Sequence, residues 1–175
     1  MNNEEYDKYY FNPVDDGDYY CVSNYTGEST TPVVPSVYQG KPVIILNDNL
    51  FKGRSDITGV TLPDTLTDIG GFVFDGCFSL RKITLPESVE NMWQYAFARS
   101  GIEEIVIPKK MRIIVPFTFF RCPNLKRVIM HSGVTTVYGN AFKDCPNLRE
   151  VVIPRSCDVH ETAFDGCPKV PFVYI

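Results

Sequence analysis

An internal repeat of 22 or 23 residues runs through most of the sequence. An aliphatic residue recurs with this period at Ile57, Leu80, Ile102, Leu125, Leu148 and Val170. A phenylalanine keeps the same period at Phe51, Phe74, Phe97, Phe119, Phe142 and Phe164. A unit of this length cannot bury its own apolar side, so successive units have to stack on one another. The repeat therefore predicts a β-rich solenoid.

Each unit contains a short strand, a second apolar pair and a tight Ala-Phe turn. In the unit that begins at Leu80, Ile83 and Leu85 alternate with polar residues, as in a half-buried strand. Pro86 ends this strand because proline has no N–H to donate to a ladder. The second apolar pair recurs as Leu66 and Ile69, Val89 and Met92, and Val134 and Val137. Stacked parallel strands lie about 4.8 Å apart, so equivalent residues should form columns along the solenoid.

Two further inner columns accompany the phenylalanines. One holds small residues at Val73, Ala96, Thr118, Ala141 and Ala163. The other holds Cys77, Cys122, Cys145 and Cys167, with Ser100 in the third unit and Arg54 in the partial first unit. Zinc ligands usually come as close Cys pairs, which this chain lacks, so we expect buried, reduced thiols and no metal or other cofactor. Cys21 and Cys157 lie off the column and remain unassigned, and replacement of Arg54 is expected to have little effect.

The unit L-x-x-I-x-I-P-x-x-V-x-x-I-x-x-x-A-F-x-x-C resembles the BspA-like class of leucine-rich repeats (the leucine-rich repeat 5 type). The resemblance covers residues 42–175. It implies a short leucine-rich-repeat stack of about five or six rungs, which the general preference of parallel crossovers makes right-handed. It also implies a cell-surface or secreted interaction module whose partners are host or matrix proteins.

The segment before the repeats differs in composition. Residues 1–12 read as an acidic flexible tail, residues 13–41 as a Tyr-rich N-terminal cap, and residues 42–175 as the solenoid. Seven of the ten tyrosines precede residue 39, and aromatic rings are suited to covering the first rung. A tyrosine platform that stacks on sugars is the alternative interpretation of this segment. Six acids and one lysine among the first eighteen residues are the opposite of a basic signal-peptide start, so a cytoplasmic location is the alternative to the surface.

Several classes of function find no support in the sequence. The net charge of −4 provides no basic excess for nucleic-acid binding. The longest uncharged apolar stretch, residues 113–120, is far shorter than the roughly 20 residues of a membrane helix. The two histidines, His131 and His160, fall in different parts of the repeat, and Gly70-Gly71 lies within a turn and not in a phosphate loop. The chain is therefore expected to be non-enzymatic.

The strand positions that face away from the core suggest a binding surface. Lys82, Glu104, Arg127 and Glu150 occupy one column with alternating charge. The next outward column contains Thr61, Thr84, Val106, Ile129, Val152 and Tyr174, and Phe172 joins the charged column on the last rung. The candidate partner-binding residues are Val106, Ile129, Val152, Phe172 and Tyr174, flanked by Glu104, Arg127 and Glu150. An exposed apolar stripe with a charged border is typical of a protein interface. A charge ladder that only sets register, and a plain preference of strands for β-branched residues, are the structural alternatives.

The sequence thus predicts a protein–protein recognition module whose partner it does not identify. Self-assembly into a homo-oligomer is an alternative, because Val173–Ile175 would form an open solenoid end with unpaired edge groups. Glycan binding through the Tyr-rich cap is a second alternative.

Overall fold

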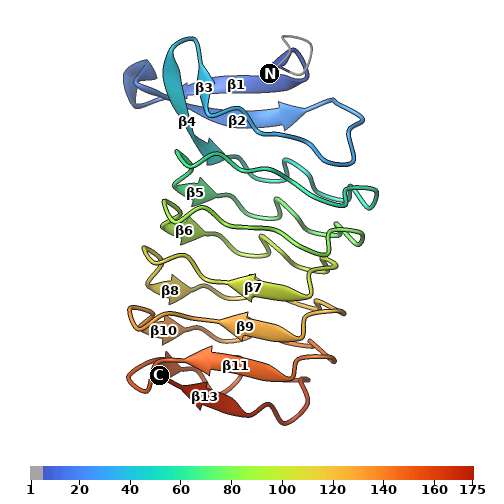
Figure 1. Ribbon diagram of the computed structural model, residues 1–175, viewed down its shortest axis with the longest axis vertical. Coiled ribbons are helices and arrows are strands. Elements are labelled where there is room, and N and C mark those ends of the chain that lie inside the picture. Colours follow the sequence, from blue (N-terminus) through green and yellow to red (C-terminus); the bar gives the residue numbers. More distant parts are fainter. Residues whose placement is uncertain (1–5) are drawn as a thin grey trace.

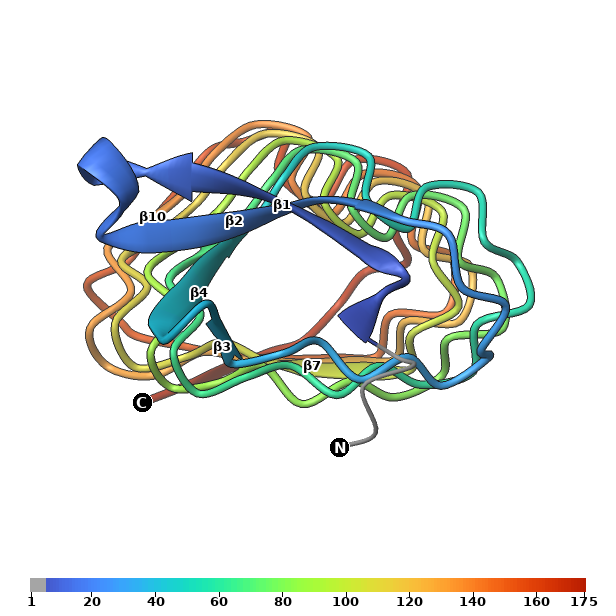
Figure 2. The same ribbon diagram turned by 90° about the horizontal axis from the view of Figure 1, so that it is seen from above.

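The computed structural model describes residues 6–175 and shows a β-solenoid of about seven turns with almost no helix (Figure 1). Seen along the long axis, the turns superpose into one flattened outline (Figure 2). The predicted solenoid is thus confirmed. The stack is longer than the repeats alone indicated because a strand of the N-terminal segment pairs in parallel with the first repeat strand and adds a rung.

The N-terminal cap is a hairpin that continues into the first rung. β1 (Tyr9–Val14) and β2 (Tyr19–Tyr25) pair antiparallel around the 3-10 turn η1 (Asp15–Gly17). β2 then pairs in parallel with β4 (Lys41–Leu46), and β3 (Val37–Tyr38) pairs antiparallel with β4.

The prediction of a flexible tail through residue 12 is wrong for the part that β1 occupies. The hairpin orders this part because the ring of Tyr9 is only 5% exposed and lies 4.5 Å from that of Tyr25. Residues 6–8 of the predicted tail precede β1, and residues 1–5 lie outside the described residues.

Aromatic side chains of the cap pack on one another and on the first rung. The ring of Tyr25 meets that of Phe51 edge-on at 5.6 Å. Phe11 and Tyr38 stack at 4.1 Å, and Tyr20 packs against Tyr38 at 4.9 Å. Edge-on and stacked pairs of this kind stabilise beyond the area they bury. These rings therefore serve to close the solenoid core.

The repeats contribute short strands to two faces of the solenoid. The back face carries β5 (Asp68–Ile69), β6 (Asn91–Met92), β8 (Ile113–Ile114), β10 (Thr136–Val137) and β12 (Asp158–Val159). Its strands divide into two sheets between β6 and β8. The front face carries a parallel sheet of β7 (Glu104–Val106), β9 (Arg127–Ile129), β11 (Glu150–Ile153) and β13 (Phe172–Tyr174).

The front sheet begins later than the sequence pattern predicted. Leu80–Leu85 alternates as a strand would but has no strand assignment, although Leu85 is buried. One rung earlier, Thr61 forms a single parallel bridge with Val33 of the cap. The first rungs of the front face therefore run as extended chain without a regular ladder.

The predicted inner columns are confirmed. The five phenylalanines from Phe51 to Phe142 are fully buried, and each stacks on the next with ring centroids 4.8–5.7 Å apart. The backbone N–H of each donates to the carbonyl of a small-column residue in the next rung, as Phe74 does to Ala96 at 2.7 Å. These hydrogen bonds hold the rungs together within the turns, where no strand is assigned.

The predicted cysteine column is confirmed by its positions and its free thiols. Cys77, Cys122 and Cys145 are buried, Cys167 is half-buried, and all are unpaired. Each sulfur donates to the carbonyl of the phenylalanine in the preceding rung, as Cys77 Sγ does to Phe51 O at 3.2 Å. Burial raises the pKa of the Cys77 thiol to about 12.

We expect the three buried column thiols to react slowly in the folded protein. A buried thiol with a raised pKa is rarely a thiolate, and the thiolate is the nucleophile. Half-buried Cys157, which lies off the column, is expected to be modified first by a disulfide reagent. Thiol counting before and after denaturation, with mass spectrometry to locate each adduct, checks this. Fast modification of Cys77, Cys122 and Cys145 under native conditions would contradict the buried column.

Candidate functional site

The predicted charge ladder is present on the front face for three of its four members, whereas Lys82 lies in extended chain before the sheet and forms no ion pair among the described residues. Glu104, Arg127 and Glu150 lie opposite one another in β7, β9 and β11. Arg127 Nε donates to Glu150 Oε1 at 2.6 Å, and its Nη1 lies 3.5 Å from Glu104 Oε2. A second pair, Lys126 Nζ and Glu103 Oε2 at 2.7 Å, lies beside it. These exposed charges largely satisfy one another, so they contribute little stability and chiefly keep the face hydrated.

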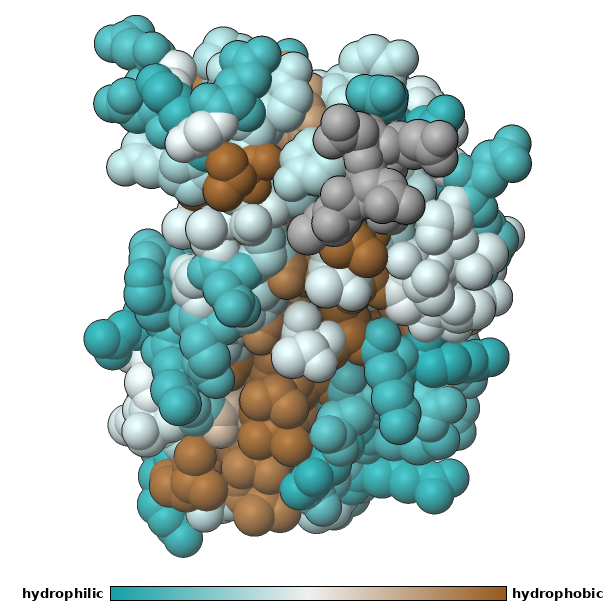
Figure 3. Space-filling view, turned by 45° about the horizontal axis from the view of Figure 1, so that its top comes forward, coloured by the Kyte–Doolittle hydropathy of each residue, from teal (hydrophilic) through white to brown (hydrophobic). Residues whose placement is uncertain are grey.

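An apolar column runs beside the ladder, as predicted. Val106, Ile129 and Val152 lie opposite one another in successive strands. Val106 is 52% exposed, and Ile129 and Val152 are half-buried. In Figure 3 a hydrophobic band continues along the part of the solenoid far from the cap, with hydrophilic side chains on both sides.

The last rung differs from the prediction by one residue. Val152 pairs with Val173, whereas Phe172 pairs with Val151 and Tyr174 with Ile153. A shift of one residue exchanges the two faces of a strand. Phe172 therefore leaves the charged column, and Tyr174 leaves the apolar column, so both assignments were wrong.

Packing of the last core ring explains this register. Phe172 turns inward, and its ring lies 5.3 Å from that of half-buried Phe164, which it covers at the end of the phenylalanine column. Pro171, directly before the strand, has no N–H for the ladder, so pairing begins at Phe172. The exposed column thus consists of Val106, Ile129, Val152 and Val173, called the front stripe below.

The front stripe leads into a hollow of about 680 Å³ at the cap-side end of its sheet. The hollow lies beside the extended segment 82–85, which precedes the first regular strand of the front sheet. Its lining combines apolar Leu85 and Val106 with charged Lys82, Glu104 and Arg127. A smaller hollow of about 470 Å³, lined by Thr61, Thr84 and Asp64 among others, follows it toward the cap. The front face therefore offers an apolar stripe, a charged border and concave surface at its cap-side end.

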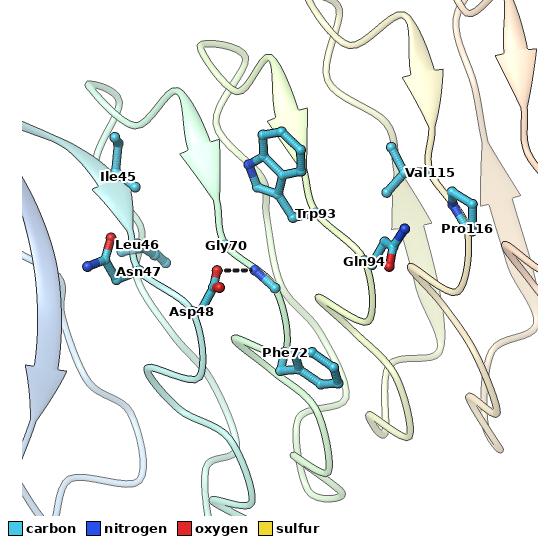
Figure 4. A pocket seen from close by; sticks show the side chains of 11 residues that line it. Ile45, Leu46, Asn47, Asp48, Gly70, Phe72, Trp93, Gln94, Val115 and Pro116 are labelled. Atoms are coloured by element: carbon cyan, nitrogen blue, oxygen red, sulfur yellow. Dashed lines mark hydrogen bonds between the residues drawn. The ribbon is translucent and has the colours of Figure 1, made fainter.

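A second groove, which the sequence reasoning missed, lies at the ends of the back strands. It measures about 600 Å³ and extends from Ile45–Asp48 across Gly70–Phe72 to Trp93–Gln94 and Val115–Pro116 (Figure 4). Asp48 Oδ1 accepts a hydrogen bond from Gly71 N–H at 2.7 Å. The sequence feature that could have indicated this groove is the Gly70-Gly71 pair together with Trp93, the only tryptophan of the chain, at outward positions of the repeat.

Both histidine rings are hydrogen-bonded to nearby backbone groups. His131 Nδ1 accepts the N–H of Gly133 at 3.0 Å, and its Nε2 lies 3.0 Å from the carbonyl of Met111. His160 Nδ1 accepts the N–H of Thr162 at 3.2 Å. Across residues 6–175 no three His, Cys, Asp or Glu side chains gather where they could hold a metal ion. The same residues contain no helix long and apolar enough to span a bilayer.

Solved structures of bacterial leucine-rich repeat proteins share this fold. A leucine-rich repeat protein of T. pallidum is 24% identical with a TM-score of 0.79, and the match covers 95% of this chain and 83% of that one. A leucine-rich cell surface protein of Faecalibacterium prausnitzii is 23% identical with a TM-score of 0.71, covering 95% and 53%. The pneumococcal vaccine antigen PcpA is 19% identical with a TM-score of 0.78, covering 95% and 48%. The chain thus spans about half the length of the latter two.

The family comparison agrees with the repeat found in the sequence. No curated protein is significantly similar to the chain. The family model for the BspA type leucine-rich repeat region matches residues 44–171 in six copies. Such repeats form protein-interaction modules and are typically non-enzymatic. The matched residues contain the phenylalanine and cysteine columns, the lining of the front hollow and the lining of the groove at the ends of the back strands. The chain belongs to the BspA-type leucine-rich repeat family.

Proposed function

We propose that this chain is an adhesin-like recognition module that binds a host or matrix protein through the front stripe. The observation that carries the proposal is the alignment of four aliphatic side chains on four adjacent strands, with Val106 52% and Val173 46% exposed. Stacking does not require this, because threonine fills the same column at Thr61 and Thr84. Exposed apolar surface beside satisfied charges is typical of an interface core and its rim.

The paired charges would give the interface its orientation. Glu104, Arg127 and Glu150 form a fixed pattern of minus, plus and minus along the stripe. A partner with the complementary pattern would be guided into register, and a partner with like charges would be repelled. Binding at this face should therefore weaken as the salt concentration rises.

A location at the cell surface is part of the proposal. It is supported by two structures of the same fold, one described as a cell surface protein and one as a vaccine antigen. Since both share less than 25% identity with this chain, the surface location is carried over to it by analogy.

The proposal is tested by removing the apolar character of the stripe. The double variant Ile129→Thr/Val152→Thr should keep its thermal midpoint and lose at least about tenfold in affinity, since the apolar core of an interface supplies most of its binding energy. Surface plasmon resonance against immobilised fibronectin, laminin and collagen provides the measurement. Val37→Thr, which changes a 42% exposed valine of the cap, is the matched control and should bind normally.

Three outcomes would contradict this function. Absence of binding to all three matrix proteins would rule out the partner class, and equal affinities of both variants would rule out the stripe. A large fall in the thermal midpoint of the double variant would show that Ile129 and Val152 belong to the core. Light scattering over a concentration series tests whether a second copy covers the stripe, in which case the double variant would be monomeric.

A further inference from the structure

A protein partner on the front face would leave the groove at the ends of the back strands without a function. The back strands lie across the outline from the front sheet (Figure 2). The groove combines a bare backbone floor, an exposed indole and a few planar polar side chains. Each of these features limits the kind of molecule that fits.

The floor of the groove is bare backbone because two glycines form it. Gly70 and Gly71 are buried, and a Cβ at Gly70 would lie 2.7 Å from the backbone nitrogen of Asp48 and the carbonyl oxygen of Leu46. Real Cβ atoms do not approach backbone so closely, so only glycine fits between these rungs. In the neighbouring rungs the position of Gly70 is held by Asn47 and Trp93, which line the groove on either side of this floor.

Trp93 supplies a flat apolar wall. Its side chain is 54% exposed, although tryptophan is usually largely buried. In Figure 4 the indole leans from its own rung toward that of Gly70 and presents its ring face to the outside. An aromatic face that remains in water at the edge of a groove is suited to cover an apolar patch of a ligand.

The polar groups of the groove favour a ligand that both donates and accepts hydrogen bonds. Asp48 is held in place by Gly71 N–H and offers carboxylate oxygens, which only accept. Asn47 and Gln94 add two amides, which donate and accept. None of the residues that line the groove is a Lys, Arg or His, and the nearby Lys52 ammonium lies over the ring of Phe72, 4.5 Å from its centroid. The carboxylate of Asp48 therefore disfavours an anionic ligand beside it.

A sugar meets all these conditions. One face of a pyranose carries only C–H groups and stacks on an indole, and its hydroxyls donate to a carboxylate. A proline-rich peptide also stacks on tryptophan, but its prolines have no N–H for Asp48. We propose that this groove binds a neutral, β-linked oligosaccharide, with one ring stacked on Trp93 and its hydroxyls bound by Asp48, Asn47 and Gln94.

The repeat itself suggests how such a ligand would run. Tyr138 occupies the same position of the repeat two rungs beyond Trp93, each with its N–H bonded to the preceding rung, and is 44% exposed. Two rungs correspond to about 10 Å along the axis, close to the length of a β-linked disaccharide. A chain along the solenoid axis could therefore stack on both rings, and a longer oligosaccharide should bind more tightly than a disaccharide.

Tryptophan fluorescence tests the proposal directly. Because Trp93 is the only tryptophan, red-edge excitation reports on this groove alone. The folded protein is titrated with cellotetraose, chitotetraose, xylotetraose and mannotetraose up to millimolar concentration, and with a proline-rich peptide. A saturable blue shift with at least one tetrasaccharide is expected, with weaker binding of its disaccharide. No response to any of the four, or a response to the peptide alone, would overturn the proposal.

Variants measured by calorimetry locate the site. Trp93→Ala should weaken binding at least about tenfold, whereas Trp93→Tyr should keep most of it because a ring face remains. Tyr138→Ala should weaken the tetrasaccharide more than the disaccharide. Phe78→Ala, which removes a 53% exposed ring that does not line the groove, should bind normally.

Unchanged affinity of Trp93→Ala would refute the site. Ile129→Thr/Val152→Thr should still bind sugar, which separates this proposal from the function of the front stripe.

Discussion

Replacement of Phe119 by alanine is expected to lower the free energy of unfolding by about 3–5 kcal/mol. Phe119 is fully buried, and its ring lies between those of Phe97 at 5.6 Å and Phe142 at 5.0 Å. Its removal would leave a cavity within the column, and the hydrogen bonds of the neighbouring rungs would resist collapse around it. Urea unfolding followed by far-ultraviolet circular dichroism measures the loss as a lower midpoint.

Two comparisons make this test specific to the column. Phe78→Ala removes a ring that is 53% exposed and should change stability by less than about 0.5 kcal/mol. Phe164→Ala should have an intermediate effect because Phe164 is half-buried at the end of the stack. Similar losses for Phe78 and Phe119 would refute the predicted repeat register.

Replacement of Arg54 by alanine is expected to lower the free energy of unfolding by about 1.5–3 kcal/mol, the range for hydrogen bonds of charged groups. The sequence suggested that this change would do little, because Arg54 only interrupts the cysteine column. In the structure its guanidinium donates to the carbonyls of Gly27 at 2.8 Å and Ser29 at 3.2 Å. It also donates to both carboxylate oxygens of Asp56 at 2.8 Å, and it lies over the ring of Tyr25. The side chain thus ties the cap to the first repeat.

Two further variants test the geometry of this contact. Arg54→Lys should recover only part of the loss, because an ammonium cannot reproduce the planar fork. Arg149→Ala, which removes an exposed arginine of the solenoid, is the control and should be nearly neutral. If Arg54→Ala proves as neutral as Arg149→Ala, the cap does not depend on this contact.

Acid titration provides an independent check on the pair. The hydrogen bonds from Arg54 lower the pKa of Asp56 from 3.8 to about 2. A carboxyl with a lowered pKa in the folded state stabilises the fold above its unfolded pKa, and this contribution is lost as the pH falls toward the folded pKa. The stability difference between wild type and Arg54→Ala should therefore narrow between about pH 4 and pH 2. A constant difference would show that Asp56 does not contribute.

Local sequence determined the solenoid and its core. A 22- or 23-residue unit with one phenylalanine, one small residue and one cysteine at fixed places can bury these residues only by stacking. The columns of Phe, small residues and Cys were therefore predictable, and so was the pairing of Arg127 with its neighbours. Both follow from the period alone, since parallel stacking places equivalent positions one above another.

Tertiary packing decided the features that depend on contacts outside the period. The register of Phe172 follows from the need to cover Phe164, and its effect on the exposed stripe could not be read from spacing. The role of Arg54 depends on the cap, whose path is not repetitive. The groove at the ends of the back strands forms because Gly70 and Gly71 lie between side chains of adjacent rungs. Those rungs are about 23 residues away in the chain. No local sequence pattern predicts such contacts. The energy of each contact depends on the distance between the two chain segments in the folded protein and not on their separation in sequence.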